Sequence, residues 1–360
     1  MELVSAKYKD NQFIYGMKFI ACLFVITIHA PFPGLFGEII GCIARFAVPF
    51  FFAVSGRYLL GDSDPDVISD ADGIRRRTHR ALIKLLRITG IVYGIYLSFS
   101  LLVHLFKGYS FIDWLSEKFN AFEAMNFVLF NSGRFVYDWS YTFDHMWYLF
   151  ALIYVYVLIY IFARVLRSWL KPLVIILLGV LFFCELLQTY YPVRLFDISI
   201  STWYVVRNWL FIGIPFVLSG IWFGNFVSRK KRELGSNEAR FFFDKLKKAA
   251  YIAIIVGIIC SFVEHRLIDS KEVYLGSVFI VAGLLLLSET GFSEKFPFSE
   301  AGKIASGKIY FYHVLILTLL DMVCGYMNIQ IWYGLRPCLI MTFSIILFYV
   351  LPRFLLWKKS

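Results

Sequence analysis

Ten predominantly apolar runs, separated by short polar stretches, constrain this chain more than any other feature. They lie at about 13–32, 37–60, 81–106, 145–166, 172–190, 203–226, 249–266, 273–289, 305–325 and 331–356. A helix needs about 20 apolar residues to cross the roughly 30 Å hydrocarbon core of a membrane. Within lipid, runs of this length satisfy their own backbone polar groups only as helices. We therefore expect an all-α polytopic membrane protein with about ten transmembrane helices, in which residues 1–360 form one integral-membrane domain.

The distribution of positive charge predicts how these helices are oriented. The formal net charge is +11, yet only 17% of the residues are charged, compared with about 25% in soluble domains. Lys and Arg gather in the N-terminal segment and in every second loop after it, for example at 75–80 and 229–232. Segments rich in Lys and Arg stay in the cytoplasm, so both termini are predicted to be cytoplasmic. Topology and contact with membrane lipids then account for the basic balance, and no nucleic acid is required.

The cysteines and the absent motifs argue against several functions. The six cysteines lie in apolar runs without C-x-x-C spacing, so we expect small buried side chains rather than disulfides or metal ligands. The sequence contains no H-E-x-x-H motif and no G-x-x-x-x-G-K-[ST] loop, which disfavours a zinc protease and an ATP-driven pump. We expect no metal and no bound cofactor.

Two ionisable residues share one face of the first apolar run. Lys18 and His29 are eleven residues apart, which is three helical turns, or about 16 Å along the axis. Ionisable groups at membrane depth cost about 2.5–3.5 kcal/mol each on insertion scales and commonly mark a site. A histidine near the outer end suits a general base, because its ordinary pKa of about 6.5 is close to neutral pH. Alternatively, Lys18 extends to the headgroups and His29 only ends the helix.

The second run contains Arg45, Pro49 and Ser55. Arg45 lies too deep in the run to be without a partner, and Pro49 removes a helical hydrogen bond. The hairpin between the first two runs is short, so Arg45, near the beginning of the second run, is expected on the same side of the membrane as His29, near the end of the first. It either stabilises a developing oxyanion beside that histidine or forms a structural ion pair, for example with Glu38 or Glu185.

Three further sets of residues are candidates for binding. Arginines bind phosphate through two parallel hydrogen bonds, but beneath a membrane they also bind lipid headgroups or set topology. The set expected on the cytoplasmic side consists of Arg75, Arg76, Arg77 and Arg80. His145 and Trp147 begin the fourth run, and His313 lies in the ninth; either histidine is catalytic or an ordinary buried side chain. Residues 107–144 mix aromatic and charged side chains, which favours a helix in the outer interface.

These motifs, in this order, resemble the acyltransferase-3 family of membrane O-acyltransferases, in its single-domain branch. The resemblance rests on Lys18 and His29; Arg45, Val48, Pro49, Phe50–Phe52, Ser55 and Gly56; Arg75–Arg80; His145, Trp147, Tyr148 and Leu149; and Ser306, Gly307, Ile309, Tyr310 and His313. The chain departs from the family pattern at Lys18, where Arg is usual, and at Arg57, where an aromatic residue is usual. It is also similar to the membrane half of vancomycin-resistance serine racemases.

The resemblance implies transfer of an acyl group, expected to be acetyl, from cytoplasmic acyl-CoA to a hydroxyl of a cell-surface or lipid-linked glycan. It also implies a multi-pass protein of the bacterial plasma membrane, with His29 as general base and Arg45 stabilising the oxyanion. The candidate substrate- and donor-binding residues are Lys18, Ser55, Arg75, Arg76, Arg77, Arg80, His145, Trp147 and His313. The serine racemases keep a second class open, a small-solute, amino-acid-like transporter, and an intramembrane sensor or scaffold is a third.

Overall fold

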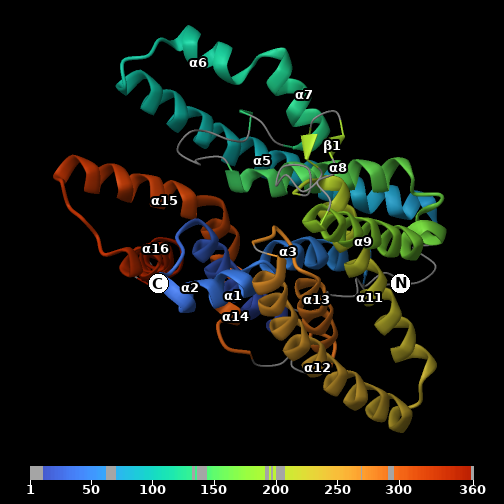
Figure 1. The fold of residues 1–360 in the computed structure, drawn as a ribbon. Coiled ribbons are helices and arrows are strands. Elements are labelled where there is room, and N and C mark those ends of the chain that lie inside the picture. Colours follow the sequence, from blue (N-terminus) through green and yellow to red (C-terminus); the bar gives the residue numbers. More distant parts are fainter. Residues whose placement is uncertain are drawn as a thin grey trace.

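The computed structural model describes nine stretches of the chain and shows a bundle of long helices (Figure 1). The described residues are 11–61, 70–131, 134–135, 144–190, 194–195, 198–199, 207–268, 270–290 and 296–357.

Eight helical segments are long and apolar enough to cross a membrane. They are Gln12–His29 (α1), Gly34–Gly61, Ala71–Phe106 (α5), Leu166–Cys184, Trp209–Glu233, Ser236–Ile268 (α12), Ser306–Met327 (α15) and Tyr333–Leu355. Two further expected runs coincide with shorter apolar helices, Trp147–Ile161 (α8) and Leu275–Leu287 (α13). Each of the ten expected runs therefore contains a helix, and the all-α polytopic class is confirmed.

Three of these segments are divided by turns or bends. Their parts are α2 (Gly34–Ala44), α3 (Ala47–Gly56) and a π-helical turn (Arg57–Gly61); a π-helical turn (Trp209–Gly213) and α11 (Ile214–Glu233); and α16 (Arg336–Ile345), a π-helical turn (Ile346–Val350) and α17 (Leu351–Trp357). The segment Leu166–Cys184 belongs to one continuous helix, α9 (Leu166–Tyr190). The remaining elements are α6 (Phe111–Lys118), α7 (Ala121–Phe130), α14 (Ser299–Ile304), the 3₁₀ turns Asp144–Met146 and Tyr333–Leu335, and a two-residue antiparallel pair, β1 (Arg194–Leu195) and β2 (Ile198–Ser199).

Polar contacts between segments agree with helices that alternate in direction. At one end, Glu289 binds both Arg57 and Lys231, and Glu300 binds Arg353. The opposite end is tied by Arg45–Glu272, Glu38–Arg266 and Asp321–Arg336. We call the first the basic end; it holds both the start of α1 and α17. By the charge argument it is the end expected to face the cytoplasm.

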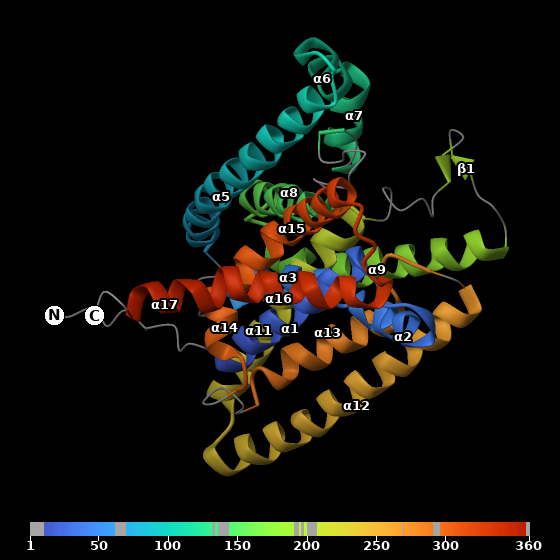
Figure 2. The ribbon, with the colours of Figure 1, turned by 90° about the vertical axis from the view of Figure 1, so that its left-hand side faces the viewer.

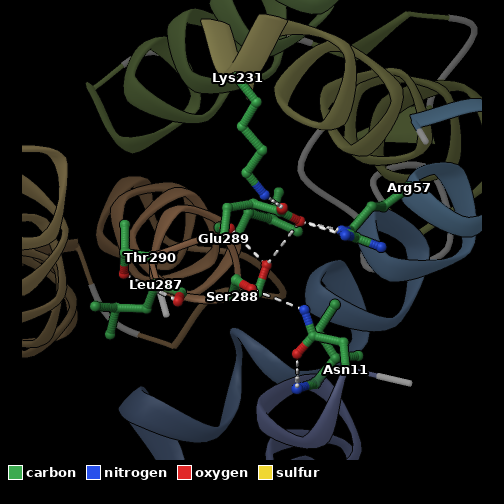
Figure 3. A network of polar contacts seen from close by, with 9 residues as sticks. Asn11, Arg57, Lys231, Leu287, Ser288, Glu289 and Thr290 are labelled. Carbon is green, nitrogen blue, oxygen red and sulfur yellow. Dashed lines mark hydrogen bonds and ion pairs between the residues drawn. The ribbon is translucent and has the colours of Figure 1, made fainter. Parts of the chain in front are cut away.

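One network at the basic end joins four segments (Figure 3). The guanidinium of Arg57 donates from Nε to Glu289 Oε1 over 2.5 Å, and the Nζ of Lys231 lies 3.2 Å from Oε2. The Arg57 and Glu289 side chains are 8% and 9% exposed. Next to them, the Asn11 amide donates to the Ser288 carbonyl over 2.7 Å. The start of α1, the turn after α3, the end of α11 and the end of α13 therefore meet here.

Small residues let the central helices pack backbone to backbone. A Cβ added to Gly220 of α11 would overlap the carbonyl oxygen of Ala53, and one added to Gly56 would overlap that of Val217. Gly224, one turn along α11, meets Gly61 in the same way. Such small-residue contacts favour tight helix association in lipid, where the hydrophobic effect between helices is absent. They fix α11 against α3, which carries part of the site.

The helices α6 and α7 form an arm at the far end of α5 (Figure 2), and α7 returns to the bundle, where the ring of Phe127 contacts that of Phe150 in α8. They fall in the stretch expected to contain an interfacial helix, of which 132–133 and 136–143 lie outside the described residues. Phe111, Ile112 and Phe122 are exposed on them, whereas the indole of Trp114 is buried and donates to Ser100 Oγ over 3.0 Å. Placement of this arm in the membrane interface stays a prediction.

Candidate functional site

A cavity of about 600 Å³ opens near the basic end, between α1, α3, α5 and α8. We call it the basic cavity. Its polar lining residues are Lys18, Ser55, Tyr58, Arg77, Arg80, Tyr148 and Tyr156. Three cations from two helices therefore face one space, which suits an anion with several charges.

Only two of the four candidate arginines line this cavity. Arg77 and Arg80 are three residues apart, so they share one face of α5. Arg75 instead contacts Asp72 at 3.5 Å, and Arg76 contacts Asp70 at 3.3 Å. The cluster therefore divides into a pair that faces the cavity and a pair that contacts the acids at the start of α5.

A second, smaller cavity of about 40 Å³ lies toward the opposite end. We call it the histidine cavity. Its polar and aromatic lining residues are His29, Arg45, His145, Trp147, Arg207, Glu272 and Tyr310. The structure thus brings the two candidate catalytic residues, His29 and Arg45, to one cavity, with His145 and Trp147 beside them. It shares no lining residue with the basic cavity.

Arg45 forms an ion pair at this cavity. Its Nη1 donates to Glu272 Oε2 over 3.1 Å, and about a fifth of each side chain is exposed. The acids suggested from the sequence were Glu38 and Glu185; Glu38 instead binds Arg266 at 2.6 Å. Arg45 lies at the break between α2 and α3, where Pro49 cannot donate to its carbonyl. The break and the ion pair together hold the guanidinium at the cavity.

Three histidines from different segments lie ring to ring. The ring centroid of His29 is 5.1 Å from that of His313 and 6.4 Å from that of His145, and the last two are 5.2 Å apart. His145 Nε2 donates to the carbonyl of Phe311 over 2.8 Å. His313 Nδ1 donates to the carbonyl of Tyr310 over 2.8 Å. These carbonyls accept only, so the tautomers of both rings are fixed.

The fixed tautomer leaves His313 Nε2 as an acceptor. This atom is buried and has no hydrogen-bond partner among the described residues. Because Nδ1 is bound to the carbonyls of its own helix, Nε2 points away from α15, and the nearby rings are those of His29 and His145. His313 itself is not part of the cavity lining. This location suits a residue that holds the His29 ring in position or shares a proton with it.

An aromatic wall separates the two cavities. Phe51 and Tyr148 line the basic cavity, and Tyr310 lines the histidine cavity. Their ring centroids are 5.2–6.2 Å apart in all three pairs. The Tyr148 hydroxyl lies 3.1 Å from Ser55 Oγ, which donates to the Phe51 carbonyl over 2.8 Å. The candidate Ser55 therefore holds the wall in place.

Sequence reasoning missed two charged residues of the histidine cavity, Glu272 and Arg207. Arg207 lies over the ring of Trp147, 5.6 Å from its centroid. The sequence offers little to find them by: Arg207 is a lone charge near the start of an apolar run, and Glu272 lies in the short charged loop before the next one. In the described part of the chain, no group of three or more His, Cys, Asp or Glu side chains is arranged to hold a metal ion.

Comparison with known families identifies the family of the chain. Residues 11–359 match the family model described as an acyltransferase domain, so the match covers nearly the whole chain. Neither the curated proteins nor the solved structures contain a match. Many apolar helices, together with this match, make the protein a multi-pass membrane acyltransferase. The chain belongs to the acyltransferase-3 family.

Proposed function

We propose that the protein moves an acyl group, acetyl in the simplest case, from acyl-CoA to a hydroxyl of a cell-surface or lipid-linked glycan. One observation carries this proposal. The basic cavity and the histidine cavity lie along the same helix α1, near opposite ends of the bundle, with one aromatic wall between them. A donor that enters from one side of the membrane and an acceptor from the other would meet at this wall.

The basic cavity suits the donor. Coenzyme A carries several phosphate charges at one end and the thioester at the other, joined by a long thin arm. Arg77, Arg80 and Lys18 would bind the phosphates through charge-assisted hydrogen bonds. Eleven residues of α1 separate Lys18 from His29, about 16 Å of helix, so an extended arm would carry the thioester toward the wall. The ammonium of Lys18 replaces the usual guanidinium as a compact charge without two-pronged geometry.

The histidine cavity suits the transfer step. His29 would take the proton of the acceptor hydroxyl while the hydroxyl oxygen attacks the thioester carbonyl carbon. The negative charge that develops on the carbonyl oxygen would be stabilised by Arg45. The carbon–sulfur bond then breaks, the ester remains on the acceptor, and the proton on His29 passes to the thiolate of coenzyme A. Trp147, which also lines this cavity, would contact the acceptor.

Transfer of label from acetyl-CoA to a glycan extract by the purified protein tests this reaction. A His29→Ala variant is expected to lose about 10²–10⁴-fold in rate, the usual contribution of a general base. His79→Ala is the matched control, because His79 is exposed on α5 and lines neither cavity. A folded His29→Ala protein that transfers acetyl at the wild-type rate would contradict the mechanism.

A small-solute transporter remains the second candidate, because two cavities on either side of a closed wall also suit alternating access. It requires accumulation of an amino acid in proteoliposomes that contain no acyl-CoA. Acyl transfer without such uptake supports the enzyme. Uptake without any acyl transfer supports the transporter.

A further inference from the structure

A second cationic cavity lies between α9 and α11, away from α1 and the donor path. Its volume is about 330 Å³. Its lining includes Arg167, Leu170, Lys171, Trp222, Asn225 and Arg229. It shares no residue with the basic cavity or the histidine cavity, and the proposed reaction does not use it.

The cations of this cavity are poorly neutralised by the protein. Arg167 and Lys171 form no ion pair with any residue that the structure describes. Arg229 has one carboxylate neighbour, Glu233, 3.5 Å away on an exposed face. The ammonium of Lys171 lies over the ring of Trp222, 5.4 Å from its centroid. The cavity therefore holds three positive charges, and Glu233 is the single carboxylate near them in the described part of the chain.

The surroundings of the cavity place it at a membrane boundary. Along α9, Ile175, Ile176 and Phe183 are exposed beyond the cavity, as expected of side chains that face acyl chains. The end of α11 that lines the cavity continues to Lys231, which belongs to the basic end. A tryptophan at such a level is typical of the headgroup region. The occupant therefore carries negative charge and borders the apolar zone.

We propose that this cavity binds the phosphate of an anionic phospholipid headgroup from the leaflet at the basic end. Arg167 and Arg229 supply two-pronged donors to phosphate oxygens, and Lys171 adds a point charge. A zwitterionic headgroup brings its own cation into this positive space, so a net-negative lipid such as phosphatidylglycerol binds more tightly. Inorganic phosphate shares the phosphate chemistry but lacks the acyl chains.

Lipid binding by the detergent-purified full chain tests the proposal, for example by native mass spectrometry with phosphatidylglycerol or phosphatidylcholine. We expect phosphatidylglycerol to bind about tenfold more tightly than phosphatidylcholine, given the usual attraction of basic residues to anionic lipid. The double variant Arg167→Gln, Lys171→Gln is expected to lose this preference. If the double variant does not fold, Arg229→Gln is tested in its place. This variant alters the α11 side of the cavity and is expected to weaken the preference for phosphatidylglycerol.

The matched control is the double variant Arg164→Gln, Lys248→Gln. It removes the same net charge from two exposed residues that do not line the cavity, and it is expected to keep the preference. Equal loss in the control and cavity variants would show that only diffuse surface charge attracts the lipid, and would overturn the site. Displacement of phosphatidylglycerol by inorganic phosphate at matched ionic strength would assign the cavity to a soluble anion instead.

Discussion

At the scale of single residues, the histidine cluster shows how backbone groups can prepare a reactive side chain. Carbonyls of α15 bind one nitrogen of His145 and one of His313. Both rings are thus anchored, and His29 projects beside them from the last turn of α1. An anchored neighbour with a lone pair would stabilise the imidazolium that forms on His29 during proton transfer.

Replacement of His313 tests this positioning role. Asparagine provides an amide N–H in place of Nδ1 but no acceptor in place of Nε2. We therefore expect His313→Asn to melt close to the wild type yet to transfer acetyl about 10²-fold more slowly. Melting temperature and turnover are measured on the same preparation, with His313→Ala for comparison. An asparagine variant with full turnover would reduce His313 to a structural residue.

The aromatic wall predicts a limit on the size of the acyl group. Phe51→Leu removes ring atoms between the two cavities while keeping an apolar side chain. The ratio of butyryl to acetyl transfer is expected to rise by about 10-fold or more, the discrimination that one or two methylenes usually give. Competition between the two labelled acyl-CoA donors measures the ratio. An unchanged ratio in an active variant would show that acyl size is set elsewhere.

Local spacing predicts which residues of a site share a helix, but not which partners come from elsewhere. Lys18 and His29 were found because both lie on one helix, at a spacing of three turns. Glu272 was missed because it lies 227 residues from its partner Arg45, and no local pattern joins them. Arg75 and Arg76 were grouped with Arg77 and Arg80 by proximity in sequence. Arg75 and Arg76 instead contact Asp72 and Asp70. Spacing alone does not separate the two pairs, because Arg76 and Arg80 are one helical turn apart.

At the scale of elements, the contact of α11 with α3 depends on the absence of a side chain at Gly220. Gly220→Ala places a methyl group against the Ala53 carbonyl, so we expect a loss of about 1–3 kcal/mol of stability. Gly94→Ala, on α5, adds the same methyl group in open space and is expected to be neutral or slightly stabilising. Thermal unfolding in one detergent compares them. Equal effects would rule out the close contact.

The cap of α6 predicts a local response to acid. The hydroxyl and backbone N–H of Ser110 both donate to Asp113 Oδ2, over 2.6 Å and 3.1 Å. These hydrogen bonds lower the pKa of the Asp113 carboxyl, so the cap is fully formed above the ordinary Asp pKa. It is lost as pH falls through the lowered pKa. Amide hydrogen exchange across α6 should therefore speed up only in acid, and Ser110→Ala should shift the onset to higher pH.

Element boundaries were predicted less well than element existence, for an identifiable reason. The fourth apolar run extends over 145–166, whereas α8 ends at Ile161. Residues 162–165 form a turn although most of them are apolar. A hydropathy pattern records which residues avoid water, but apolar side chains such as Phe162 and Val165, which are exposed on this turn, can face lipid from a turn as well as from a helix. The pattern therefore overestimates the length of a helix that is followed by an apolar turn.

At the scale of the whole molecule, the ion-pair network at the basic end ties together segments that are far apart in sequence (Figure 3). Glu289→Gln would remove the Glu289 carboxylate from the buried guanidinium of Arg57, and breaking such a buried pair typically costs about 3–5 kcal/mol. Glu300→Gln removes an exposed pair with Arg353 and is expected to cost at most about 1 kcal/mol. Unfolding in denaturing detergent measures both, and similar losses would contradict a central role for Glu289.

The overall topology was accessible from sequence because charge in the loops and hydropathy in the helices are both local properties. The Lys and Arg content of every second loop predicts that successive helices run in opposite directions. The ion pairs at both ends of the bundle agree with this prediction. The cavities were not accessible, because their volume depends on how side chains from α1, α3, α5 and α8 pack against one another.

The wall formed by Phe51, Tyr148 and Tyr310 has a consequence for the cell as well as for the reaction. A membrane that stores energy as a proton gradient tolerates no continuous file of water through a protein that spans it. With these three rings packed at steep angles between the basic cavity and the histidine cavity, acyl transfer across the bilayer would not open a path for protons. Expression of the protein should therefore not depolarise the membrane.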